Sequence, residues 1–507
     1  MNKILRSHEC SPVWTSLTIL IVFAVCFAVP RPASAQAVLL KVSQDNFTNS
    51  GSQHRTEVEP DTYSWGSTIV SAFQVARNPV WGGADVGFST SADGGHTWTY
   101  GYLPGITVNY QGGTYPAASD ASVAYDPKHN VWLIATLPIT NPIGDILVSR
   151  STDGGFTWGN PITVDFTHVD DKGWIVCDTT PTSPYYGNCY LAWDAAYSTG
   201  QIKISTSTDG GLTWGPALST ADHAVGQGTQ PLVQPNGTVV VAFTNGGLYA
   251  TRSTNGGQSW SSVSVISPNG PTHNPAGGFR TLLLPNAEID EAGKMYVAWQ
   301  DCRFRSGCSS NDIVMSTSTD GVTWSSVARI PIDPVSSTVD HFIPGIGVDY
   351  ATSGSTAHLT LVYYYFPVSN CGGSCQLDVG YVTSQDGGNT WTGGRQLAGP
   401  MQLSWLPDSD LGKMVADYIS VSYVNGNAYS VFAVANPLNT ALFGEAMYTT
   451  LHPLMSLPGE PLYSSAGEQP IPGAHSDHPP MIYYDDEGRY PVPPSKQGHP
   501  GDDDNNH

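Results

Sequence analysis

Polar or charged residues begin each of the seven chain segments that we expect to be the first strands of a repeated β unit. Only 12% of the residues are charged, so the composition alone would not place one at most of these positions. Carboxyl groups crowded at one opening split their pKa values, so that one can donate a proton while its neighbour stays ionised, as glycoside hydrolysis requires. The seven residues are Glu59, Asp120, Asp171, Gln230, Arg280, His341 and Asp417.

The acidic members of this set are the predicted catalytic residues. Asp120 and Asp171 begin neighbouring units and are the predicted acid and base, with Glu59 as a third candidate. Tyr418 is a candidate nucleophile, because a phenol can be activated by an adjacent carboxylate such as Asp417. The alternative is structural, since channel mouths are polar in any case and Asp favours the turns that precede strands. The other members are expected to contact substrate: Gln230, Arg280, His341 and Asp417.

Three arginines are candidates for binding an anionic group of a substrate. Arg77, Arg280 and Arg303 fall at the same expected end of the repeated units. Converging guanidinium groups would bind a carboxylate through paired hydrogen bonds. Asp301 lies in the same loop as Arg303 and is a further candidate for substrate binding. The alternative is that each arginine pairs with a carboxylate of the ring.

A short phrase is written six times between residues 91 and 391, at the repeat length typical of propellers and arrays. It reads Ser-Thr-Asp-Gly-Gly-Phe-Thr-Trp at 151–158, and each copy stands between two runs of β-branched and aromatic residues. This pattern predicts a hairpin, in which the glycines adopt positive φ and the Asp accepts backbone hydrogen bonds. The copies span 91–98, 151–158, 207–214, 253–260, 318–324 and 384–391.

The spacing of the strands predicts a β-propeller with four strands in each blade. Six units carry the phrase, and a seventh set of strands follows between residues 416 and 450. This last set lacks a fourth strand, which the segment 38–42 can supply, closing the ring and protecting its edges. We therefore predict an all-β fold of seven blades closed by the N-terminal strand. The alternative is six blades with a terminal appendage.

The repeated phrase resembles the Asp-box, Ser-x-Asp-x-Gly-x-Thr-Trp, of the sialidase-like or BNR-repeat propellers. The resemblance extends over nearly all of residues 36–457 and implies the propeller fold, while the chemistry of a fold must be argued from its site. The chain departs from true sialidases in one motif. They carry Phe/Tyr-Arg-Ile-Pro near the start of the propeller, whereas the one Arg-Ile-Pro here is at 329–331, after the fifth phrase. The sialidase catalytic residues are therefore not transferred to positions in this chain.

The two ends of the chain differ in composition from the rest. Lys3 and Arg6 precede an apolar run at 15–29 and a small-residue site at 33–35, which predicts a signal peptide cleaved after Ala35 and an exported protein. No later stretch is long and apolar enough for a membrane helix. Residues 458–507 are rich in Pro, Gly, His and Asp and are expected to form a disordered tail. The propeller is thus expected at 36–457.

Six cysteines remain after the expected cleavage, and they fall into three local pairs. An even set at short separations in an exported chain predicts disulfides that hold loops. A metal site is the alternative, but the pairs are far apart and lack His at ligand spacing. The predicted pairs are Cys177 with Cys189, Cys302 with Cys308, and Cys371 with Cys375.

The net charge of −22 argues against nucleic acid as a partner, because an acidic protein repels polyanions at long range. We expect a monomer that acts on a glycan or another extracellular ligand, without a cofactor or metal. The leading interpretation is a secreted, sialidase-like glycoside hydrolase that uses paired carboxylates at the channel mouth. The alternatives are a non-catalytic carbohydrate- or protein-binding propeller and a scaffold without a small ligand.

Overall fold

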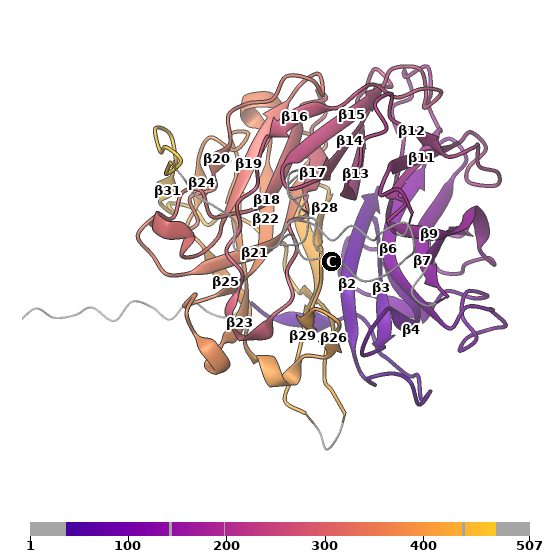
Figure 1. The fold of residues 1–507 in the computed structure, drawn as a ribbon, viewed down its shortest axis with the longest axis horizontal. Coiled ribbons are helices and arrows are strands. Elements are labelled where there is room, and N and C mark those ends of the chain that lie inside the picture. Colours follow the sequence, from indigo (N-terminus) through magenta and orange to yellow (C-terminus); the bar gives the residue numbers. More distant parts are fainter. Residues whose placement is uncertain (1–36, 141–143, 197, 439–441, 473–507) are drawn as a thin grey trace, which may run out of the picture. The chain divides into compact units, whose positions relative to one another are not determined.

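The computed structural model describes residues 37–472, apart from 141–143, 197 and 439–441 (Figure 1). This part of the chain is all-β, in a β-propeller arrangement, which confirms the predicted class. Helix is limited to five single 3-10 turns, η1 (Ala276–Gly278), η2 (Ser306–Cys308), η3 (Gly354–Thr356), η4 (Gly372–Ser374) and η5 (Leu403–Trp405). The predicted signal peptide lies outside the described residues, as does the tail from 473 onward.

Four sheets have four antiparallel strands each. Three of them use strands in chain order: β13 (Gln227–Val233), β14 (Val239–Thr244), β15 (Leu248–Ser253) and β16 (Ser264–Ser267); β17 (Asn286–Ile289), β18 (Met295–Asp301), β19 (Asp312–Ser318) and β20 (Ala328–Arg329); β21 (Asp340–Val348), β22 (Leu359–Phe366), β23 (Gln376–Ser384) and β25 (Arg395–Gln402). The fourth takes strands from both ends of the chain: β1 (Leu39–Lys41), β30 (Ala446–Thr450), β29 (Asn427–Val434) and β28 (Ser420–Val424).

The N-terminal part of the chain forms one sheet of eleven strands. Its strands are β2 (Glu57–Trp65), β3 (Thr68–Arg77), β4 (Gly83–Ser91), β5 (Thr99–Tyr102), β6 (Ala117–Asp126), β7 (Val131–Ile139), β8 (Gly144–Ser151), β9 (Ile162–Cys177), β10 (Cys189–Asp194), β11 (Ile202–Ser207) and β12 (Leu218–Ser219). Two short pairs complete the described strands: β24 (Trp391–Thr392) with β31 (Leu462–Tyr463), and β26 (Asp408–Ser409) with β27 (Gly412–Lys413).

Seven of these strands contact one another in a closed cycle. β2 contacts β6, which contacts β9, and the series continues through β13, β17, β21 and β28 back to β2. Each of these strands either contains one of the seven polar residues identified from the sequence or begins a few residues after one of them. The cycle therefore brings the starts of seven distant segments to one region of the molecule.

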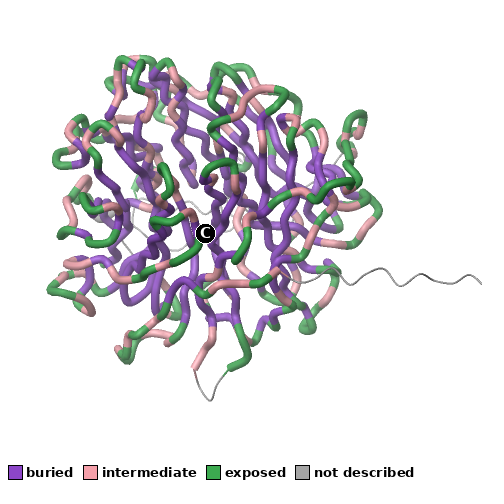
Figure 2. The backbone as a smooth tube through the Cα atoms, turned by 180° about the vertical axis from the view of Figure 1, so that it is seen from behind, coloured by how far each residue is buried: buried purple, intermediate pink, exposed green. Residues whose placement is uncertain are grey.

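The strands of the sheets are apolar on both faces because each sheet is covered by its neighbours on either side. β7 reads VWLIATLPI and is buried along its whole length. In Figure 2 the buried backbone follows the strands, and the exposed backbone lies mainly at the turns. The apolar residues form several separate clusters between adjacent sheets. The packing between sheets, rather than one central core, holds the fold together.

The turn at 151–158 is held by its own side chains. Ser151 Oγ donates to Asp153 Oδ1 at 2.8 Å, and the same oxygen accepts the Thr157 N–H at 3.0 Å. Gly155 has φ of 87°, and a Cβ at this residue would lie 2.6 Å from Val70 Cγ2 on the preceding strands. Glycine is therefore required here both for the backbone conformation and for the close contact.

The three predicted disulfides are present, which confirms the pairing. Cys177 and Cys189 face each other across β9 and β10, while the other two bridges close short loops. Among the described residues, no helix is long and apolar enough to cross a bilayer.

The chain past residue 458 continues to contact the sheets. β31 pairs with β24, and the carboxylates of Glu460 and Glu468 bind Arg395 and Arg329. The sequence-based expectation of a tail beginning at 458 thus differs from the structure over 458–472. These ion pairs and the short strand hold the segment 458–472 against the sheets, since it has no apolar core of its own.

The predicted N-terminal closing strand is confirmed. β1 pairs antiparallel with β30, with Leu39 opposite Thr450. Next to this pairing, the Ser43 hydroxyl donates to the carboxyl of Glu57, and Met447 N–H donates to both side chains. Glu57 is fully buried and its Oε1 has no hydrogen-bond partner. Burial raises the pKa of Glu57 to about 8.

The buried carboxyl of Glu57 makes the closure pH-dependent. Its proton is held up to about pH 8 in the fold but is released near pH 4.3 in the unfolded chain. Its contribution is therefore present below pH 4.3 and is lost as the pH rises to about 8, so the free energy of unfolding should fall from pH 5 to pH 8.5. Glu57→Gln should reduce this dependence in calorimetric Tm measurements. Glu291→Gln, at an exposed carboxyl, should not, and an equal change in both variants would contradict the assignment.

Candidate functional site

A backbone irregularity recurs near the start of five of the seven strands in the cycle. The pairing register shifts in β2, β6, β9, β13 and β21, and each shift includes a residue with positive φ. Such bulges re-aim side chains and are common beside functional sites. A non-glycine residue in this conformation costs about 1–3 kcal/mol, so it marks a constrained site. The residues are Glu59, Asp120, Lys172, Gly228 and Ile343, with φ of 57°, 46°, 45°, 68° and 53°.

Lys172 is the centre of a buried ionic network. Its Nζ lies 3.1 Å from Asp120 Oδ1 and 2.7 Å from Asp417 Oδ2. Arg280 binds the same Asp417 carboxylate with two donors, Nε at 2.8 Å and Nη2 at 2.6 Å, and reaches Asp410 Oδ1 with Nη1 at 3.0 Å. The network joins β6, β9 and the segments that precede β17 and β28.

The network fixes the charge of its members. Burial alone would raise the pKa of Asp417, but Arg280 and Lys172 outweigh it and hold this pKa well below its usual range. For Lys172, burial would lower the pKa, but the carboxylates of Asp120 and Asp417 raise it well above its usual value. Asp417 is therefore a permanent carboxylate and Lys172 a permanent ammonium at neutral pH.

Glu59 lies beside this network but carries no direct cation. Gln74 Nε2 donates to Glu59 Oε2 at 3.1 Å, and Gln74 Oε1 accepts from Arg77 Nη1 at 2.6 Å. Burial, followed by the charge of Asp120, raises the pKa of Glu59 to about 8. At neutral pH the Glu59 carboxyl therefore holds its proton.

Asp171 is half-buried, so it is more accessible than the buried carboxyls of Glu59, Asp120 and Asp417. Its Oδ1 accepts the Lys172 backbone N–H at 2.9 Å. Burial and the charge of Asp120 raise the pKa of Asp171 to about 7. Asp171 can therefore exchange a proton at neutral pH.

A small pocket opens beside Lys172. Its cavity volume is about 10 Å³, room for about one water molecule and far below the ~300–1,000 Å³ of pockets for drug-sized ligands. The Tyr418 ring packs edge-on against Trp174 with centroids 4.8 Å apart, and Lys172 Nζ lies 5.3 Å from the Tyr418 centroid. Burial and then the carboxylates raise the pKa of Tyr418, which favours the neutral phenol. The lining residues are Asp120, Lys172, Gly173, Trp174, Gly228, Thr229, Gln230, Leu284, Pro285 and Tyr418.

Three of the predicted residues lie in separate local networks. Arg303 binds both oxygens of Asp301, at 2.9 and 2.6 Å, and also the carbonyl of Asn269. His341 is buried against Tyr363, and burial lowers the pKa of His341. Of the remaining predicted residues, Asp120 and Asp417 contact Lys172, and Arg280 is joined to Lys172 through Asp417. Gln230 and Tyr418 line the adjoining pocket, and Glu59 is linked to Arg77 through Gln74.

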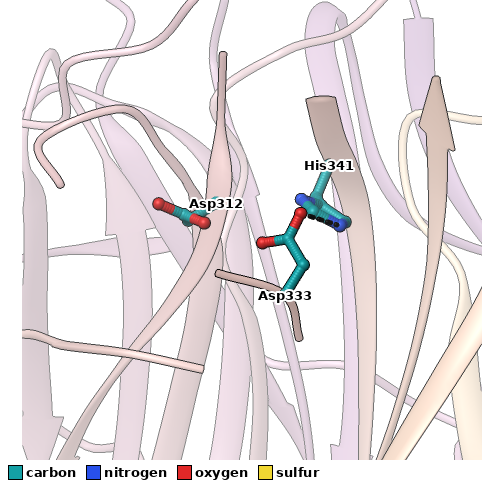
Figure 3. A group of neighbouring side chains, drawn as sticks. All are labelled: Asp312, Asp333 and His341. Atoms are coloured by element: carbon teal, nitrogen blue, oxygen red, sulfur yellow. Dashed lines mark ion pairs between the residues drawn. The ribbon is translucent and has the colours of Figure 1, made fainter. Parts of the chain in front are cut away.

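His341 also belongs to a cluster with Asp312 and Asp333, whose side chains lie together in Figure 3. Their ligand atoms fall within 4.8 Å of one another, a spacing that would suit a metal ion. Arg305 Nη2 nevertheless binds both carboxylates, and Arg329 Nη1 lies 3.4 Å from Asp312. The guanidinium groups already balance these charges, so the cluster is an ion-pair network.

The sequence places Asp194 in a loop at the same end as the predicted ring and Lys172 next to the ring, but it assigned neither residue a role in the site. Lys172 adjoined the predicted ring, but its role depends on the positive φ that turns its side chain inward. Asp194 lies directly opposite Asp171 in the β9–β10 pairing. The Asp-Asp-Lys run at 170–172 was the one signal that could have drawn attention to Lys172.

Replacing Lys172 by Met should destabilise the fold strongly. The change leaves Asp120 without its cation in a buried setting, and breaking a buried pair costs about 3–5 kcal/mol. Urea unfolding measures this loss. Arg395→Met is the matched control, because its pair with Glu460 is more exposed and is worth at most ~1 kcal/mol. Equal losses in the two variants would contradict the central role of Lys172.

Comparisons with known proteins found similarity in solved structures. A scan against protein-family models and a search of curated proteins gave no match. A protein of unknown function from Dyadobacter fermentans is 15% identical, with 69% of this chain and 98% of that chain covered and a TM-score of 0.45. The leech intramolecular trans-sialidase is 12% identical, with coverages of 64% and 67% and a TM-score of 0.42. The NanB sialidase of Streptococcus pneumoniae is 14% identical, with coverages of 81% and 70% and a TM-score of 0.41. The identity is low in each case, and none of these structures is a close match to this chain.

Proposed function

We propose that the protein is a glycan-active propeller whose central pocket hydrolyses a glycosidic bond. The observation that carries this proposal is that the carboxyl groups around Lys172 differ in their protonation state. Asp417 is held ionised, the Glu59 carboxyl holds its proton at neutral pH, and Asp171, with a pKa raised to about 7, can exchange one. Glycoside hydrolysis needs such a pair, one carboxyl acid and one carboxylate, on either side of the scissile bond.

The proposed roles follow the accessibility of each group. Asp171, half-buried and with a raised pKa, is the acid that protonates the leaving oxygen. Asp120 lines the pocket and is bound by Lys172, so it is the carboxylate that activates water or stabilises the developing positive charge. Trp174 and Tyr418 give the pocket aromatic faces for a sugar ring, and Gln230 gives it an amide.

The same proposal includes a count of seven blades with turns of the Asp-box type. The closed cycle of seven strand contacts supports this count. β9 is long enough to serve as the last strand of one blade over 162–165 and the first of the next over 171–177, so the eleven-stranded sheet divides into three blades. The hydrogen bonds of Ser151, Asp153 and Thr157 support the turn type. Export as a monomer is also proposed, and the three disulfides support an oxidising compartment.

A second candidate is a propeller that binds a saccharide without cleaving it. The ion pairs of Lys172 with Asp120 and Asp417 favour this alternative, because they satisfy two carboxylates that catalysis would use. In this case Trp174 and Tyr418 would provide the binding surface.

Hydrolysis of a panel of 4-nitrophenyl glycosides separates the two candidates. We expect turnover of at least one member and a loss of roughly 10²–10⁴-fold in kcat for Asp171→Asn, because a general acid contributes about that factor. Asp120→Asn should also lose turnover. Asp378→Asn is the control, since this buried aspartate with a raised pKa belongs to another sheet.

Two results would contradict the assignment of roles. Full turnover by both Asp171→Asn and Asp120→Asn would remove these residues from the reaction. Saccharide binding that quenches tryptophan fluorescence, with no turnover on any glycoside, would favour the binding module.

A further inference from the structure

Carboxyl groups outnumber cations around the pocket. Five carboxyl groups are close enough to affect one another's ionisation. Among the described residues, two cations bind these carboxyl groups directly, Lys172 and Arg280. Both cations are already committed to Asp417. The site therefore has unused capacity for positive charge. The five carboxyls belong to Glu59, Asp120, Asp171, Asp194 and Asp417.

The surplus is concentrated at one cross-strand pair. Asp171 on β9 lies directly opposite Asp194 on β10. Like charges in this position destabilise a sheet unless a cation or a proton intervenes. Asp194 is 2% exposed, and within the described residues no hydrogen-bond donor reaches its Oδ1. An orphaned buried carboxyl oxygen of this kind costs free energy and calls for a donor.

Another sheet of the same chain contains the same cross-strand arrangement with its cations supplied. Asp301 on β18 lies opposite Asp312 on β19. Arg303 binds Asp301 and Arg305 binds Asp312, each through two hydrogen bonds. Of these two cross-strand pairs, Asp301 and Asp312 each have an arginine, whereas Asp171 and Asp194 do not.

The site offers nothing equivalent to an anionic ligand. Arg280 is occupied by Asp417 and Asp410, and Arg303 by Asp301. Arg77 is buried and donates to Gln74 and to the carbonyl of Val80. Among the described residues, the one donor atom of these three guanidinium groups recorded as buried without a partner is Arg77 Nε.

We propose that the Asp171–Asp194 pair is a subsite for the ammonium group of an amino sugar. The inference rests on the proposed function, which makes the adjoining pocket a glycan site, and it names the class of saccharide. An ammonium brings one positive charge and three N–H donors, which match the half-buried Asp171 and the unpartnered oxygen behind it. Trp174, three residues after Asp171, lines the adjoining pocket and would then contact the sugar ring.

Binding should release a proton. Burial and the charge of Asp120 raise the pKa of Asp171, and burial and the charge of Asp171 raise that of Asp194 well above its usual value. The ammonium would replace the proton that Asp194 holds at neutral pH, and Asp171 would keep its proposed role as the acid. The titratable groups that face the pair are Asp120, Asp170, Lys172 and Asp417.

Isothermal titration of the intact protein at pH 7.0 tests the subsite with four probes: methyl glucosaminide, its N-acetyl form, methyl glucoside and N-acetylneuraminic acid. We expect the ammonium sugar to bind at least roughly tenfold more tightly than the others, about the value of one charge-assisted hydrogen bond. Titrations in two buffers of different ionisation enthalpy should detect proton release. Equal affinities, a preference for the anionic sugar, or no binding by any probe would overturn the proposal.

Asp194→Asn should abolish the preference and the proton release, with Asp378→Asn as the matched control. If Asp194→Asn fails to fold, Asp171→Asn gives the same readout at the half-buried partner. Titration with calcium chloride is the remaining arm, and a bound Ca²⁺ that Asp194→Asn loses would instead assign the pair to a metal.

The two proposals can fail separately. Cleavage of neutral or N-acetylated glycosides without any preference for the ammonium sugar would overturn the subsite and keep the hydrolase. Tight binding of the ammonium sugar without turnover would keep the subsite and overturn hydrolysis.

Discussion

The contact between Lys172 and the carboxylates of Asp120 and Asp417 is the constraint on which the rest of the site depends. These residues come from strands far apart in the sequence, and Arg280 adds a fourth segment to the same network. Buried charges are tolerated only when they are paired, so each segment must arrive in register for the others to be satisfied. The network therefore specifies the arrangement of the inner strands as well as the chemistry at their ends.

The fold follows from local patterns in the sequence. The repeated phrase, the β-branched runs around it and the closely spaced cysteines depend on neighbours within a few residues, and the structure has the strands and disulfides that were predicted. The closing strand could be predicted because the last set of strands lacked a partner. The ion pairs that hold 458–472 could not be anticipated, because Arg329 and Glu468 are 139 residues apart.

The site was only partly predictable for a related reason. Counting polar strand starts found the carboxyls of Glu59, Asp120 and Asp171, which do gather near one another. The same count included His341, which belongs to a separate ionic cluster. What distinguishes these positions is the bulge that turns Lys172 inward and the register that sets Asp194 opposite Asp171. Both depend on backbone geometry over several strands, and neither is marked by a recognisable pattern of residues in the sequence.

The sheet that contains β1 and β30 has a consequence for how the molecule is made. Its first strand leaves the ribosome long before its partner at 446–450 exists, so for most of synthesis the chain has an open end with an unpaired strand edge. Only the arrival of the final strands removes that edge. Joining the two ends of the chain and opening it at an exposed turn would bring β1 and β30 close together in sequence. Their pairing would then form early and locally, instead of late and between distant segments.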